Sequence, residues 1–141
     1  MKILILCTAN SCRSQMAHGF LQKLDSRLRV FSAGTQASGQ LNQKAVLVMK
    51  EAGIDISRHT SDPVELYLNQ EWDYVITVCG GARDSCPAFS GKVKNRLHMG
   101  FDDPALESGS EEYIWSRFRS VRDEIRECMQ QFYMERIAPS L

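Results

Sequence analysis

Short apolar runs alternate with amphipathic stretches along this 141-residue chain. Residues 3–6 are apolar throughout, and residues 73–78 are rich in β-branched and apolar side chains, which is typical of strands buried on both faces. Residues 29–32 and 96–99 are shorter strand candidates, the first of which ends at Ala33-Gly34. The pattern therefore predicts four strands, which are separated by segments whose apolar residues do not follow a strand pattern.

Those separating segments have helical periodicity. A helix is expected to begin at Arg13, a second to span residues 42–52 with Gly53 as its cap, and a long third one to begin at about Ser110 and to include Phe132. A short helix is expected after Pro63, whereas Gly80-Gly81 is expected in a loop. The last helix carries its apolar residues on one face: Ile114, Phe118, Val121, Ile125, Cys128, Met129 and Phe132.

Strands that alternate with helices predict an α/β fold, with a parallel sheet covered by helices on both faces. We expect one domain over residues 1–141 and the strand order 2-1-3-4. In such sheets, ligands bind beyond the carboxyl ends of the strands, between the first and the third. Cys7 ends the first strand and Cys79 ends the third. Because neighbouring strands lie about 4.8 Å apart, these two thiols should emerge close together.

Composition narrows the classes of function. Lys plus Arg equals Asp plus Glu, at 17 each, so we expect no broad basic surface for nucleic acid. No apolar run approaches the roughly 18 residues of a membrane span, and the N-terminal run is too short for a signal peptide. We therefore expect a cytoplasmic protein, and a monomer. Five cysteines in such a chain indicate catalysis or redox cycling rather than a static disulfide framework.

The segment from Cys7 to Ser14 joins the first strand to the first helix and is the candidate active site. Backbone N–H groups of such a loop, together with the positive end of the helix dipole, suit a tetrahedral oxyanion. The same field should lower the pKa of the Cys7 thiol. Arg13 supplies planar, permanently charged donors, and Asn10 tolerates a left-handed turn. The residues expected to line the loop are Thr8, Ala9, Asn10, Ser11, Cys12, Arg13 and Ser14.

With these residues the chain resembles thioredoxin-coupled arsenate reductases, a branch of the low-molecular-weight tyrosine phosphatase fold. The resemblance covers nearly the whole chain. Its matching segments are Cys7 to Ala17, Ser32-Ala33-Gly34, His59-Thr60-Ser61, Val78-Cys79 with Cys86-Pro87, and Gly100 to Ala105. The loop by itself indicates only the phosphatase superfamily. The added Cys79 and Cys86 are more specific, because a plain phosphatase needs one catalytic thiol.

The resemblance implies a triple-cysteine relay that reduces arsenate to arsenite in arsenic detoxification. Cys7 is the nucleophile, Cys79 then attacks Cys7, and Cys86 attacks Cys79. Reduced thioredoxin recycles the enzyme, no cofactor is tightly bound, and phosphate is an analogue of the substrate. The resemblance also selects Asp103, rather than Asp102, as the general acid that protonates the leaving hydroxide. It implies in addition that the Ser14 hydroxyl donates to the Cys7 thiolate.

Geometry constrains the last thiol exchange. If residues 79–86 formed a regular helix, the two Cα atoms would lie roughly 10 Å apart. A disulfide tolerates at most about 7 Å. The segment must therefore be irregular or must unwind on oxidation, and Gly80-Gly81 lowers the steric cost of such a change.

One position departs from the family. Many of these reductases have a glutamate where this chain has His18, and that glutamate helps to bind a potassium ion near the loop. A neutral histidine is a poor ligand for a hard cation. We therefore predict no metal site, although four other residues could offer oxygen atoms: Asn10, Ser32, Thr60 and Asp62.

Two other functions are compatible with the same loop. A low-molecular-weight protein tyrosine phosphatase would hydrolyse phosphate monoesters, and a weak activity of this kind is expected even of the reductase. It would need aromatic side chains beside the acid, yet Asp103 is followed by Pro104-Ala105-Leu106. A non-catalytic oxyanion sensor would not need the relay thiols. The sequence leaves the reductant open among thioredoxin, a glutaredoxin and a small thiol.

Overall fold

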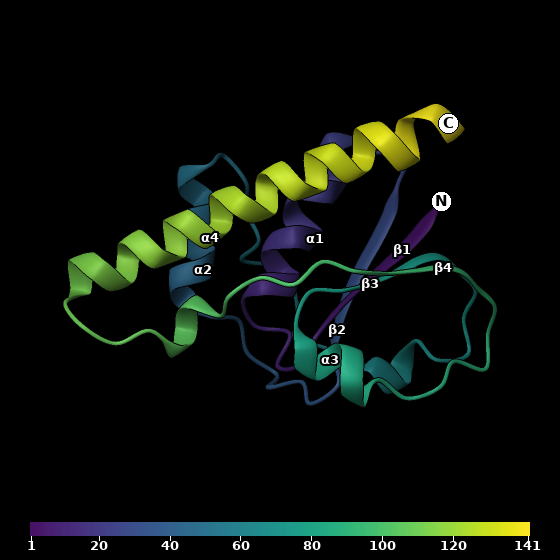
Figure 1. The fold of residues 1–141 in the computed structure, drawn as a ribbon, viewed down its shortest axis with the longest axis horizontal. Coiled ribbons are helices and arrows are strands. Elements are labelled where there is room, and N and C mark those ends of the chain that lie inside the picture. Colours follow the sequence, from purple (N-terminus) through teal and green to yellow (C-terminus); the bar gives the residue numbers. More distant parts are fainter.

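The fold is built on a four-stranded parallel sheet with the strand order β2-β1-β3-β4 (Figure 1). The structure is a computed structural model and describes residues 1–141. The strands are β1 (Lys2–Cys7), β2 (Arg29–Gly34), β3 (Trp72–Thr77) and β4 (Val93–His98). The order confirms the predicted α/β fold. Two strands differ clearly from their predicted bounds: β4 begins three residues earlier than expected, and β2 includes Ala33-Gly34, where it was expected to stop.

The two central strands form the middle of the core. Five of the six residues of β1 are buried, and so are five of the six in β3. Leu6 pairs with Thr77, so β1 and β3 end side by side. The continuous apolar runs of these strands are thus explained by burial on both faces.

Three long helices cover the sheet. They are α1 (Arg13–Leu24), α2 (Gln43–Glu51) and α4 (Glu111–Phe132), and α4 lies across α1 and α2 (Figure 1). The Asn42 side chain caps α2 and the Ser110 hydroxyl caps α4. The apolar stripe predicted for α4 is buried as expected, except that Ile114 and Cys128 are only half-buried. No helix combines the length and the apolar character needed to cross a membrane.

A fourth helix corrects the prediction of a loop at Gly80-Gly81. Residues Gly80–Ser85 form α3, which lies at the carboxyl ends of the strands (Figure 1). The helix starts there because the Cys79 sulfur accepts the N–H of Ala82 and so caps its first turn. The shorter turns are η1 (Val64–Leu66), η2 (Pro104–Leu106), η3 (Tyr133–Ile137) and η4 (Ala138–Ser140).

Replacing the cap of α4 should destabilise the fold by a small, measurable amount. The Ser110 hydroxyl accepts the N–H of Tyr113 at 3.1 Å, and Ser110→Ala removes that acceptor. We expect a loss of about 1 kcal/mol in the free energy of unfolding, measured in urea. Ser116→Ala, an exposed change within the same helix, should cost less than about 0.5 kcal/mol. Equal stabilities for the two variants would contradict this role of Ser110.

Candidate active site

The loop after β1 is held by its carbonyl groups. The carbonyls of five successive residues, 7–11, each accept a hydrogen bond from outside the loop. The donors include the backbone N–H groups of Thr35, Gln36 and Ser38 from the segment after β2, at 2.9–3.1 Å. Asn42 donates in the same way to Ser11, at 2.9 Å. The loop is therefore clamped on its outer side by the chain around it.

Because the carbonyls point outward, the amides of the loop are left free to bind an anion. The N–H groups of residues 9–13 donate to no acceptor within the protein. They surround a cavity of about 150 Å³ that is lined by residues 7–13 and by Asp103. Successive amides that point into one concavity form an anion site.

Two residues give the loop its shape. Asn10 is the one non-glycine residue with positive φ, at 52°, as the sequence predicted. Its buried side chain donates to the Ser14 hydroxyl at 2.8 Å and accepts the Asp62 N–H at 2.9 Å. Gly34 lies against the Thr8 carbonyl so closely that a Cβ atom there would clash with it. The loop conformation thus depends on one left-handed residue and one close approach.

Arg13 connects the loop to the segment that carries the candidate acid. Its guanidinium donates to the Phe101 carbonyl at 3.1 Å and to Asp103 at 3.3 Å. The Asp103 side chain is 23 % exposed and faces the loop. Asp102 is turned outward instead, is 82 % exposed, and pairs with Arg117 at 3.5 Å. The structure therefore brings Asp103, and not Asp102, to the anion site.

Cys79 enters the site from the end of β3, beside Cys7. Its sulfur lies 3.3 Å from the Thr8 hydroxyl and within hydrogen-bonding reach of the Cys7 thiol. Both cysteines are buried, each with 4 % of its surface exposed. The predicted meeting of these two thiols is therefore present in the structure.

The pKa values of the two thiols are shifted in opposite directions. The hydrogen bond from Cys7 lowers the pKa of Cys79 to about 4, helped by the Thr8 hydroxyl, the Ala82 N–H and Arg13. The same contact, together with burial, raises the pKa of Cys7, although Arg13 and the Thr8 N–H act in the opposite direction. The sequence predicted a lowered pKa for Cys7. In the structure it is the pKa of Cys79 that is lowered, because Cys79 receives more hydrogen bonds.

The remaining loop side chains have structural positions. The Ser14 hydroxyl accepts from the Asn10 amide, and the structure shows no hydrogen bond from it to Cys7, the contact that the resemblance implied. Cys12 is buried at the start of α1, where burial and the nearby Asp103 raise its pKa to about 12. We assign Cys12 no step of the chemistry.

Cys86 lies at the other end of α3 from Cys79. It ends the helix, is half-buried, and donates from its thiol to the Pro87 carbonyl at 3.4 Å. Burial raises its pKa, and the charge of Arg96 opposes that effect. Since a helix separates the two cysteines, a bond between them requires α3 to unwind.

Sequence reasoning missed two contributors at this junction. The Thr8 hydroxyl contacts the Cys79 sulfur, and Gly81 leaves room for that hydroxyl, because a Cβ atom there would lie 2.7 Å from it. The only sequence feature that points to this contact is the run Cys79-Gly80-Gly81. Its two glycines were interpreted as a source of flexibility rather than of close packing.

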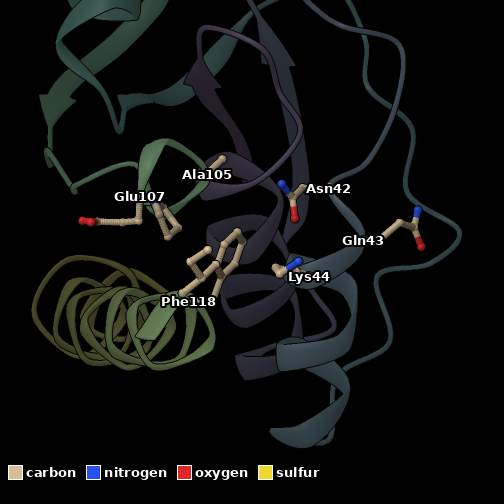
Figure 2. Close-up of a pocket in the computed structure, with 8 residues that line it drawn as sticks. Asn42, Gln43, Lys44, Ala105, Glu107 and Phe118 are labelled. Atoms are coloured by element: carbon tan, nitrogen blue, oxygen red, sulfur yellow. The ribbon is translucent and has the colours of Figure 1, made fainter. Parts of the chain in front are cut away.

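A larger cavity, of about 320 Å³, opens beside Asp103. It lies between the start of α2, the η2 turn and α4, and Phe118 points into it towards Ala105 (Figure 2). Glu107 and Gln43 point away from Phe118 (Figure 2). No cysteine lines this cavity, whereas Cys7, Arg13 and Asp103 all line the smaller loop cavity. The loop cavity is therefore the better candidate for the chemistry.

Comparison with known proteins agrees with this geometry. Residues 2–139 match the family model described as low molecular weight phosphotyrosine protein phosphatase. An arsenate reductase of Bacillus licheniformis is 52% identical over 131 residues, or 92% of this chain and 93% of that one. An arsenate reductase of Bacillus subtilis is 50% identical over 131 residues, again 92% of this chain and 93% of that one.

Solved structures have the same fold. An arsenate reductase in the phosphate binding state has a TM-score of 0.79 and 32% identity, over 95% of this chain and 97% of that one. A tyrosine phosphatase of Erwinia amylovora has a TM-score of 0.75 at 19% identity, over 94% of this chain and 91% of that one. The second comparison shows the fold alone.

The thiolate of Cys79 should be measurable by its absorbance at 240 nm. The other four cysteines have raised pKa values, so only Cys79 should be ionised between about pH 4 and neutrality. Its thiolate should disappear as the pH falls through about 4. Thr8→Val removes one hydrogen bond and should move this midpoint up by about one pH unit, whereas Thr8→Ser should not. Identical titrations of both variants and the wild type would exclude the contribution of Thr8.

Proposed function

The chain belongs to the low molecular weight phosphotyrosine protein phosphatase family, and on this basis we propose that it is an arsenate reductase that uses three cysteines in relay. Relatives about 50% identical over nine-tenths of the chain are named arsenate reductases, which supports reduction rather than hydrolysis. The single observation that carries the proposal is the contact of Cys79 with both Cys7 and Thr8 inside the anion site.

In the first step, the Cys7 sulfur attacks arsenic(V) while the loop amides and Arg13 hold the other arsenate oxygens. For this step the shared proton of the sulfur pair moves from Cys7 to Cys79. A sulfur–arsenic bond forms and an arsenic–oxygen bond breaks. Asp103, at the mouth of the loop, protonates the hydroxide so that it leaves as water.

In the second step, Cys79 gives the proton that it took from Cys7 to an oxygen atom of the arsenic adduct and, as a thiolate, attacks the Cys7 sulfur. A Cys7–Cys79 disulfide forms, and the electron pair of the sulfur–arsenic bond goes to arsenic. Arsenic(V) is thereby reduced to arsenic(III) and leaves as arsenite, while the two thiols are oxidised by two electrons. The lowered pKa of Cys79 favours this step, because the thiolate is the attacking form.

In the third step, Cys86 attacks the Cys79 sulfur and releases Cys7 as a thiol. The resulting Cys79–Cys86 disulfide forms only when α3 unwinds, and unwinding exposes it to a reductant. A dithiol protein of the thioredoxin class then reduces the Cys79–Cys86 disulfide by thiol–disulfide exchange and is itself oxidised, which returns the enzyme to its starting state.

Phosphate ester hydrolysis is the second activity that the site could support. Phosphorus(V) bound to Cys7 is not reduced by a thiol, so that adduct is released by water instead. The residues after Asp103 are Pro104, Ala105 and the exposed Leu106, none of which offers an aromatic ring. We therefore expect hydrolysis of aryl phosphates as a weak by-product.

The proposal predicts a different phenotype for each cysteine. With arsenate, thioredoxin, thioredoxin reductase and NADPH, the wild type should oxidise NADPH, and Cys7→Ser, Cys79→Ser and Cys86→Ser should each lose at least about 100-fold in rate. Without thioredoxin, reduced Cys86→Ser should still release one arsenite per molecule, since Cys7 and Cys79 suffice. Cys128→Ser, a half-buried thiol outside the site, is the matched control.

Two outcomes would contradict the relay. One is hydrolysis of an aryl phosphate at full rate with no NADPH consumption in the presence of arsenate, which identifies a phosphatase. The other is arsenite release by Cys79→Ser at the wild-type rate, which removes the second thiol from the reaction.

Oxidation should unwind α3. Amide hydrogen exchange of residues 80–86 should be faster by at least about tenfold in the Cys79–Cys86 oxidised protein than in the reduced protein, because its helical hydrogen bonds break. The amides of α1 serve as the internal control and should not change. Equal protection of α3 in both states would show that the disulfide forms without unwinding.

A further inference from the structure

Two histidines that the relay does not use are stacked behind the anion loop. The rings of His18, on α1, and His59, on the segment before η1, have centroids 4.2 Å apart and planes inclined by 26°. His18 Nδ1 lies 2.9 Å from the Ser32 hydroxyl, and His59 Nδ1 lies 3.0 Å from Gln15 Oε1. Each ring is thus fixed by a contact in its own plane and by the other ring.

The second of these contacts leads directly to the loop. The Gln15 side-chain amide donates at 3.0 Å to the carbonyls of Asn10 and Thr60. Since its nitrogen faces two acceptors, its oxygen must accept, and His59 must donate from Nδ1. Gln15 is fully buried, and Asn10 is the left-handed residue of the loop. A chain of hydrogen bonds therefore runs from His59 through Gln15 to the turn that shapes the anion site.

The potassium ion implied by the resemblance does not fit this arrangement. A hard cation needs several free oxygen ligands and usually a carboxylate. All four candidate ligands already take part in hydrogen bonds within the protein, although Asp62 uses only its Oδ2 atom. Ser32 is paired with His18, Asn10 accepts from the Asp62 N–H, and Asp62 accepts from the hydroxyls of Thr60 and Tyr67 at 3.0 and 3.2 Å.

The histidine pair carries no charge at neutral pH. Burial, together with the neighbouring His59, lowers the pKa of His18 to about 3. Burial also lowers the pKa of His59, although the carboxylate of Asp55 opposes this effect. Two neutral rings can stack at this distance without repulsion.

We propose that the stacked His18–His59 pair, acting through Gln15, holds the anion loop in its binding conformation and makes anion binding independent of potassium. His18 and His59 are then positioning residues, because neither touches the bound anion. The consequence concerns affinity for the oxyanion rather than the thiol chemistry.

The first test measures the binding of inorganic phosphate to the reduced full-length wild type by titration calorimetry. Phosphate is bound by the loop but is not reduced, so the result does not depend on the proposed relay. The dissociation constant is compared in potassium chloride and in choline chloride at equal ionic strength. We expect values equal within about twofold. Binding that is tenfold tighter in potassium would overturn the proposal, and no variant has to fold for this comparison.

The second test separates the hydrogen bond of His59 from its stacking. His59→Phe keeps a ring against His18 but loses the donor to Gln15, and should weaken phosphate binding by about tenfold with little change in melting temperature. His59→Asn restores an N–H donor and should bind within about threefold of the wild type. His98→Phe replaces the remaining histidine, which contacts Thr77, and should bind normally.

Wild-type affinity in His59→Phe would overturn the proposal. The proposal would also be overturned if phosphate affinity and melting temperature fell together in both His59 variants. That outcome would give the histidine pair a role in stability alone.

Discussion

The site depends on the adjacency of β1 and β3 in one parallel sheet. Their register ends both strands at the same edge, so that the loop after Cys7 and the thiol of Cys79 meet although 71 residues separate Thr8 from Cys79. Parallel strands place their carboxyl ends together, and ligands bind there. The second thiol beside the anion site is the feature by which the proposed reductase differs from a plain phosphatase on this fold.

The segments around the anion loop hold it in place and supply no reacting groups. The segment after β2 and the start of α2 hold the carbonyls of the loop, and the Gln15–His59 contact holds its left-handed turn. A preorganised site of this kind does not have to reorganise when the oxyanion binds. By contrast, α3 is a short helix between Cys79 and Cys86, and in the proposed relay it has to unwind before these two thiols can form a disulfide.

Much of this could be predicted from the sequence. The apolar runs and helical periods predicted the strand order, and the ends of the first and third strands predicted the contact between the thiols of Cys7 and Cys79. Helix α3 could not be predicted, because Gly80-Gly81 favours a loop and only the Cys79 sulfur, as a cap, reverses that preference. The ionisation of the sulfur pair and the stacking of His18 on His59 depend on contacts between distant segments, which no local pattern encodes.

The most direct test of the account is a disulfide map of the protein after one turnover. Fully reduced protein is mixed with one equivalent of arsenate without any reductant, quenched with a thiol-alkylating reagent, and digested for mass spectrometry. The account predicts one arsenite per molecule and one disulfide that always includes Cys79, joined to Cys7 or to Cys86. Arsenite released in that amount while Cys79 is recovered fully alkylated would contradict it.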